Sequence, residues 1–282
     1  MSQTPLVLGL VLLAAVLHAV WNALIKSSAD AWLTMLMVFG TGSAACALGL
    51  PFVEPPDRGS WPWLAAGIVL HNGYVVFLLL SYRVGDLSHV YPLARGCGPL
   101  LVALLSGRVV GEHLSAPELA GSVLVSLGIA SLALDRSVAT PAGRRAASFA
   151  LATGVWIAGY TLVDAMGVRR SGSTLGYILW LQASEAVPFL VATLAIRRRA
   201  ALAFAASAAG RRGAAGGLMA TLAYSLVLWA YSLGAVAPIA ALRETSTIIA
   251  ALIGTLLLGE PFGGRRILAA LLVAAGVLAI NL

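Results

Sequence analysis

Long apolar stretches, separated by short polar connections, run through the whole chain. A helix needs about 20 mostly apolar residues to cross a bilayer. Stretches of about that length lie at residues 5–25, 32–52, 62–82, 88–107, 116–134, 147–167, 174–195, 214–234, 237–257 and 264–281. The pattern predicts an all-α integral membrane protein with ten transmembrane helices.

The segment 89–134 recurs at the end of the chain. Shifted by 148 residues, its Arg95 falls on Arg243. In the same alignment, which needs no gap from Arg95 onward, the pair Gly111–Glu112 falls on Gly259–Glu260. The chain therefore has the pattern of a duplication in which each half carries an arginine inside its fourth span.

The duplication predicts two five-helix repeats, residues 1–134 and 147–282, joined by a linker at 135–146. Because each repeat has an odd number of spans, the second would enter the membrane upside down relative to the first. Inverted repeats of this kind are common in secondary transporters, which bind their substrate near the midplane, where the repeats meet. The organisation thus favours transport before any motif is considered.

Composition and charge agree with a membrane protein. Charged residues make up 10% of the chain, and the mean hydropathy is +0.94, whereas a soluble domain carries roughly 25% charged residues. The net charge of +7 comes mainly from arginines in short loops, so we do not expect a nucleic-acid partner. We expect a protein of the cytoplasmic (inner) membrane. Twelve Lys and Arg follow odd-numbered spans and four follow even-numbered ones, which predicts that both termini lie outside. Cys46 and Cys97 lie within apolar spans, and neither a disulfide nor a metal or other cofactor is expected.

Four sequence motifs carry a family resemblance: HAVWNALIKSS in the first span, YPLARGCGPLLVALL in the fourth, VVGEHLSAPELAG after it, and LLLGEPF in the second half. With these motifs the chain resembles the EamA-like ten-span members of the drug/metabolite transporter superfamily. The resemblance implies export or exchange of amino acids and other small metabolites, while relatives move nucleotide sugars, sugar phosphates or lipid-linked sugars. It also implies a central cavity lined by helices of both repeats.

The first span carries a polar stripe that lipid would not tolerate. His18, Trp21, Asn22 and Lys26 share one helical face, and hydrocarbon offers no hydrogen bonds to them. We expect His18, Trp21 and Asn22 to line the cavity and Lys26 to reach the membrane surface. The alternative is that His18 and Asn22 only bond neighbouring helices.

The fourth span places Tyr91 and Arg95 on one face, and Pro92 and Pro99 within it predict a bent or partly unwound helix. Arg95 could bind a carboxylate or phosphate, because its guanidinium offers a bidentate fork. An ion pair with an acid on another helix stays open as the alternative.

In the ninth span, Arg243 and Glu244 are adjacent, so they point about 100° apart and are not expected to pair. Glu185 in the seventh span is the predicted partner of Arg243, with substrate or proton binding as the alternative. Because only Arg95 has prolines and glycines around it, we expect Arg95 to bind substrate and Arg243 to serve the structure.

Further candidates come from the remaining spans. A histidine could take up protons near neutral pH, although a packing role is the alternative for His71. Asp164 near a span end is expected to be a hydrated terminal charge, and Glu112 and Glu260 to cap the helices that follow them. The other cavity candidates are Tyr74, Trp156, Tyr160, Tyr224 and Glu244.

We therefore expect a secondary active or facilitative transporter that works by alternating access, most simply an exporter of amino acids or similar small metabolites. A flippase for a lipid-linked sugar and an uptake carrier for an organic anion or phosphonate-like compound stay open as alternatives. The chain has no H-E-x-x-H or G-x-S-x-G motif, so an enzyme is not expected. The expected partners are a small-molecule substrate and the lipid bilayer, with proton coupling left open, and the carrier would be a monomer or a homodimer.

Overall fold

A computed structural model describes residues 4–25, 28, 30–84, 87–132, 141–258 and 264–281 of the chain. About 90% of the chain is helical, and the described residues contain no strand. Two short 3-10 turns, η1 (Leu50–Phe52) and η2 (Arg58–Ser60), lie between the second and third helices. The α-helices are α1 (Pro5–Ile25), α2 (Ala31–Gly49), α3 (Trp61–Val84), α4 (Leu87–Val109), α5 (Ala116–Ser131), α6 (Pro141–Arg169), α7 (Thr174–Glu185), α8 (Val187–Ala206), α9 (Ala208–Leu233), α10 (Val236–Arg243), α11 (Thr245–Leu258) and α12 (Gly264–Ile280).

Six described stretches are long and apolar enough to cross a membrane, and they involve α1, α2, α3, α6, α7 with α8, and α9. Helix α5 and the segment Ile267–Ile280 are apolar but shorter. Large apolar side chains such as Leu6 and Leu256 are exposed on the outer faces of the helices, where lipid rather than water can cover them. The chain is an all-α membrane protein.

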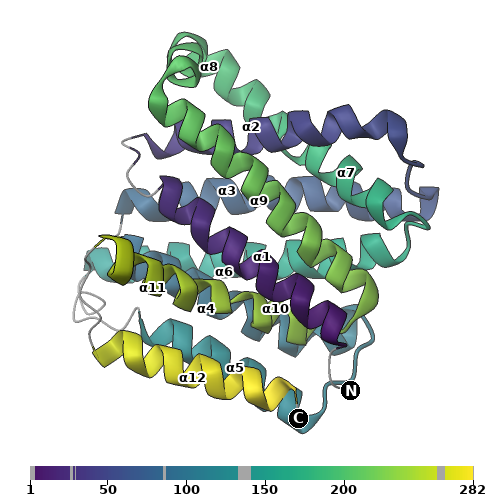
Figure 1. Cartoon of the computed structure of the whole chain (residues 1–282), viewed down its shortest axis with the longest axis vertical. Helices are drawn as coiled ribbons and strands as arrows, with labels where there is room; N and C mark the ends of the chain where they lie inside the picture. Colours follow the sequence, from purple (N-terminus) through teal and green to yellow (C-terminus); the bar gives the residue numbers. More distant parts are fainter. Residues whose placement is uncertain are drawn as a thin grey trace.

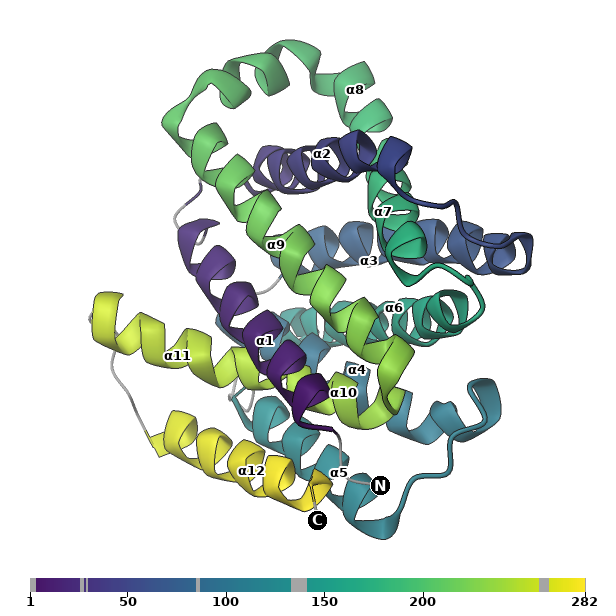
Figure 2. The same ribbon diagram turned by 45° about the vertical axis from the view of Figure 1, so that its right-hand side comes forward.

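Pairs of helices from distant parts of the sequence form the body of the molecule. Helices α1 and α9 run side by side and cross obliquely over α3, α6 and α4 (Figure 1). Helix α3 packs along α6, and α2 packs along α9. Figure 2, turned by 45°, again shows α5 beside α12 at one end of the molecule and α8 at the other.

Glycines let α5 and α12 approach at backbone distance. A Cβ added to Gly121 would lie 2.5 Å from the carbonyl oxygen of Gly276, and one added to Gly276 would lie 2.6 Å from the carbonyl oxygen of Gly121. Gly128 lies against Leu272 in the same way. Small residues at such crossings are a common packing device of membrane helices.

The interruptions of the helices differ from the sequence expectation. Helix α4 is continuous through Pro92 and Pro99, so it is not unwound around Arg95, and the bend that the prolines predict stays a prediction. The glycines there serve close packing instead, because a Cβ on Gly96 would lie 2.9 Å from the backbone of α5, and one on Gly98 would lie 2.7 Å from Ile157 of α6.

The predicted span 237–257, in contrast, is interrupted at Glu244, between α10 and α11. The N–H of Glu244 donates to the carbonyl of Ala241, and the N–H of Thr247 donates to the carbonyl of Glu244. Both hydrogen bonds span three residues instead of the four of an α-helix, which is the 3-10 pattern and tightens the helix locally. A second break, at Ala186 before Pro188, separates α7 from α8, and proline disfavours helical continuation at this point.

Candidate functional site

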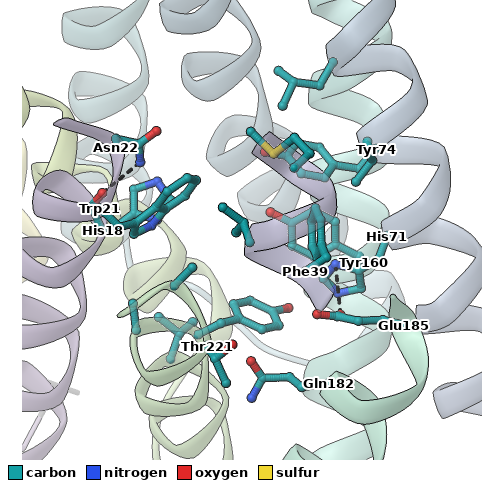
Figure 3. A pocket seen from close by; sticks show the side chains of 18 of the residues that line it. His18, Trp21, Asn22, Phe39, His71, Tyr74, Tyr160, Gln182, Glu185 and Thr221 are labelled. Carbon is teal, nitrogen blue, oxygen red and sulfur yellow. Dashed lines mark hydrogen bonds and ion pairs between the residues drawn. The ribbon is translucent and has the colours of Figure 1, made fainter. Parts of the chain in front are cut away.

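A cavity of about 120 Å³ lies between α1, α2, α3, α4, α6, α7, α9 and α10 (Figure 3). Its wall combines charged, aromatic and apolar side chains from both halves of the chain. Ten of the sequence candidates line it: His18, Trp21, Asn22, His71, Tyr74, Arg95, Tyr160, Glu185, Tyr224 and Arg243. The structure thus brings these residues together, and their role in substrate binding stays a prediction.

Two of the described candidates do not line the cavity. Trp156 packs against Phe77, with ring centroids 5.6 Å apart, and lies over Gly73 of α3. Glu244 is fully buried behind the wall. Tyr91 belongs to α4, but its side chain lies outside the described residues, as do Lys26 and Glu260.

The α1 side of the cavity is held by hydrogen bonds along one helix. Trp21 donates from its indole N–H to Nδ1 of His18 at 3.2 Å, and Asn22 donates from its amide to the carbonyl of His18 at 2.8 Å. Figure 3 shows these three side chains facing Tyr74, His71 and Tyr160 across the cavity. The predicted polar stripe is therefore turned inward, as the absence of hydrogen-bonding partners in lipid requires.

A histidine between two carboxylates forms the opposite side. Nε2 of His71 lies 2.8 Å from Oδ2 of Asp164, and Nδ1 lies 3.4 Å from Oε2 of Glu185. Tyr224 donates its hydroxyl to the same Asp164 oxygen at 2.5 Å, and the ring of Tyr160 stacks on His71 at 4.3 Å. Four helices thus meet around one imidazole.

Asp164 corrects the sequence analysis. It is fully buried and is not a hydrated terminal charge. Helix α6 continues to Arg169, beyond the predicted end at residue 167, so Asp164 lies more than one turn inside and faces α3 and α9. The burial of Asp164 could have been predicted from its four-residue spacing from Tyr160, which places both side chains on the inward face of the helix.

The arginines form the third part of the site. Nη2 of Arg95 lies 2.8 Å from Oε1 of Glu244, with both side chains buried. Nη2 of Arg243 donates to the hydroxyl of Tyr160 at 3.3 Å, and its Nε lies 3.9 Å from the same Glu244 oxygen. The Nε of Arg243 has no hydrogen-bond partner among the described residues.

Two sequence expectations about these charges are wrong. Glu185 lies beside His71 and not beside Arg243, because it is the last residue of α7 and is fixed there by Asn72, whose amide donates to its carbonyl at 2.8 Å. Arg243 and Glu244 approach each other although they are adjacent, because α10 ends between them. Arg95 has the closer carboxylate, and the expected division of roles between the two arginines stays a prediction.

Sequence reasoning missed several polar residues of the cavity wall. Gln182 donates from its amide to the Ser225 hydroxyl at 2.8 Å, which ties α7 to α9. Thr221 and Ser43 also line the cavity. Gln182 shares a helical face with Glu185, which was a usable signal, whereas single hydroxyl residues in apolar spans give none.

Ion pairs between the two halves lie away from the cavity, toward the helix ends. Glu112 follows Gly111, whose φ of 75° suits glycine, and does not cap α5 as expected. Both of its carboxylate oxygens accept the N–H of Val236, at 2.9 Å, so Glu112 caps α10, and it also pairs with Arg169 at 2.8 Å. The start of α5 is capped by Ser115 with its own capping box.

A second pair lies between the start of α2 and the kink of α8. Asp30 caps α2 by accepting the Leu33 N–H at 3.0 Å, and it accepts Arg197 Nη2 at 2.7 Å. Partial burial raises the pKa of Asp30, but the hydrogen bonds and charge of Arg197 and the Leu33 N–H outweigh it and hold that pKa below its ordinary value. Arg197 itself has a non-helical φ of −127°.

Comparisons with known proteins bear on the fold alone. No family model and no curated protein matches the chain. A solved structure described as "Crystal structure of protein" superposes with a TM-score of 0.76 and covers 97% of this chain and 95% of its own length. At 17% identity, this likeness shows that the chain has the fold of that structure.

Proposed function

We propose that the chain is a secondary carrier of the EamA-like drug/metabolite transporter type that moves amino acids or similar small metabolites across the cytoplasmic membrane, most simply as an exporter. The observation that carries the proposal is a cavity between membrane helices whose wall holds charges of both signs. A zwitterion needs both, because its carboxylate and its ammonium each lose water on binding.

The distribution of charge fits such a cargo. Arg95 and Arg243 face one described carboxylate, Glu244, so this side carries a net positive charge. The Arg243 guanidinium, whose Nε–H has no hydrogen-bond partner among the described residues, is suited to a carboxylate. The side formed by His71, Asp164 and Glu185 carries a net negative charge, which suits an ammonium group.

The packing supports two inverted repeats of five spans. If α7 with α8 and α10 with α11 each count as one span, the chain has ten. In this numbering α1 corresponds to α6, α3 to α9, and α4 to α10 with α11. Helices α3 and α4 pack on α6, and their counterparts α9 and α10 with α11 pack on α1. Helices α5 and α12, which are counterparts, pack on each other. Such exchange symmetry suits alternating access, in which one half rocks against the other. With the positive-inside distribution, both termini would lie outside.

Counterflow of labelled cargo in proteoliposomes tests the function. A panel of amino acids, organic acids and phosphorylated sugars should show saturable exchange of amino acids. Arg243→Gln should raise the KM for a carboxylate-bearing cargo at least tenfold, because a charge-assisted contact contributes about 1.5–3 kcal/mol. Arg108→Gln, at an exposed site on α4, is the matched control. Absence of counterflow for every amino acid, or an unchanged KM in Arg243→Gln, would contradict the proposal.

An organic-anion carrier is the second candidate, because two arginines share one buried carboxylate. The same panel separates the two. Exchange of organic acids or phosphorylated compounds without exchange of amino acids would favour the anion carrier.

A further inference from the structure

Two buried carboxylates, Asp164 and Glu185, share the imidazole of His71 in the cavity wall. The net charge of this cluster is negative. With a neutral His71, Asp164 and Glu185 together carry two negative charges. With a protonated His71 they still leave one. Because buried charge without a counter-charge is costly, the cluster with a neutral His71 favours one added positive charge, which either a proton or an ammonium group can supply.

The two carboxylates are not equivalent. Asp164 is fully buried, does not line the cavity, and is held by the Tyr224 hydroxyl at 2.5 Å. Glu185 lines the cavity and is farther from the imidazole, with Oε2 at 3.4 Å from Nδ1. That Oε2 has no hydrogen-bond partner among the described residues. Asp164 therefore orients His71, and Glu185 is the exchangeable contact.

The remaining groups around the cluster do not supply the missing charge. Tyrosine and cysteine are uncharged near neutral pH, and Arg243 donates to the hydroxyl of Tyr160, whose ring stacks on His71, rather than to either carboxylate. The titratable and charged groups that face the cluster are Cys46 from α2, Tyr74 from α3, Tyr160 from α6, Tyr177 from α7, Tyr224 from α9 and Arg243 from α10.

We propose that His71, Asp164 and Glu185 form a proton-binding site, and that a proton on His71 and the ammonium group of the cargo compete to balance the charge of Glu185. This rests on the proposed function, and it makes the carrier a proton–cargo exchanger. In one state the proton lies on His71 between the two carboxylates. When cargo binds, its ammonium takes the place of that positive charge beside Glu185, and the proton leaves His71 through the cavity to water. Charge in the cluster is conserved, so each cargo molecule that enters releases one proton.

The dependence of KM on pH tests the competition in proteoliposomes. For an amino acid, the wild-type KM should rise as the pH falls, by up to about tenfold per pH unit where the proton occupies the site. Glu185→Gln should bind this cargo more weakly and lose the pH dependence, whereas Glu54→Gln, at an exposed site, should keep it. An organic acid of similar size without an ammonium group should show no such rise. If the KM of Glu185→Gln follows the wild-type pH dependence, the competition is wrong.

Infrared difference spectra of the purified protein test proton binding without any transport. Lowering the pH should produce a protonated-carboxyl or imidazolium signal that is lost in Glu185→Gln and His71→Gln but kept in Glu54→Gln, with thermal unfolding confirming that each variant is folded. If the signals of all variants match the wild type, the proton site is wrong. If no cargo exchanges but the signal is lost in Glu185→Gln and His71→Gln, the proton site holds and the proposed transport function fails.

Discussion

Replacing Glu244 with glutamine removes the carboxylate that compensates both arginines of the cavity wall. Oε1 of Glu244 lies 2.8 Å from Nη2 of Arg95 and 3.9 Å from Nε of Arg243, and none of the three side chains is more than 6% exposed. The variant keeps the size of the side chain but leaves two positive charges in a buried, membrane-spanning region. Removing one partner of a buried pair typically costs about 3–5 kcal/mol.

The free energy of unfolding, measured by denaturant titration in detergent micelles, should therefore fall by about 3–5 kcal/mol in Glu244→Gln. Glu54→Gln, an exposed glutamate, should change it by less than about 0.5 kcal/mol. A double variant, Arg95→Met with Glu244→Gln, should recover much of the loss, because the uncompensated charge on α4 is then gone. Strictly additive losses would show that the two residues do not interact, and the electrostatic argument would be refuted.

Two further outcomes follow from the helix contacts and the end pairs. Gly276→Leu should destabilise the protein by about 1–3 kcal/mol or more in the same titration, because its Cβ would overlap the α5 backbone. Gly9→Leu, on an open face of α1, is the control and should be tolerated. Equal effects of the two substitutions would contradict the close packing of α5 on α12. For Asp30, whose pKa is held below its ordinary value, the stability contributed by the pair with Arg197 is present at neutral pH and is lost as the pH falls below about 4. The difference in melting temperature between wild type and Asp30→Asn should therefore shrink between pH 7 and pH 3, and a constant difference would contradict the pairing.

The membrane character and the inward polar face of α1 could be predicted from the sequence. A run of apolar residues long enough to cross a bilayer is typical of a transmembrane helix, and His18 with Asn22 cannot face hydrocarbon. His71 and Tyr160, which were named as cavity candidates without this argument, also line the cavity. Lipid therefore makes the sequence informative, because it restricts where a polar side chain can lie.

The choice of partners could not be predicted. Glu185 pairs with His71 and Glu244 with Arg95, and each pairing depends on the rotation and depth of two helices distant in sequence. The break at Glu244 changes that rotation locally, and no proline or glycine marks it. The depth of Asp164 was missed for a related reason, since a shift of a few residues in a span end moves a side chain from the surface into the core.

Buried charges whose partners lie far along the chain also constrain how this protein can be made. Asp164 follows His71 by 93 residues, and Glu244 follows Arg95 by 149, which is 244 minus 95. At a synthesis rate of about 5–20 residues per second, a span of the first half waits roughly 5–30 s for its partner. During that interval Arg95 lacks Glu244, and an arginine at the centre of a helix costs about 2.5–3.5 kcal/mol on insertion. We therefore expect the first half to be an assembly intermediate that stays at the insertion machinery until α10 arrives.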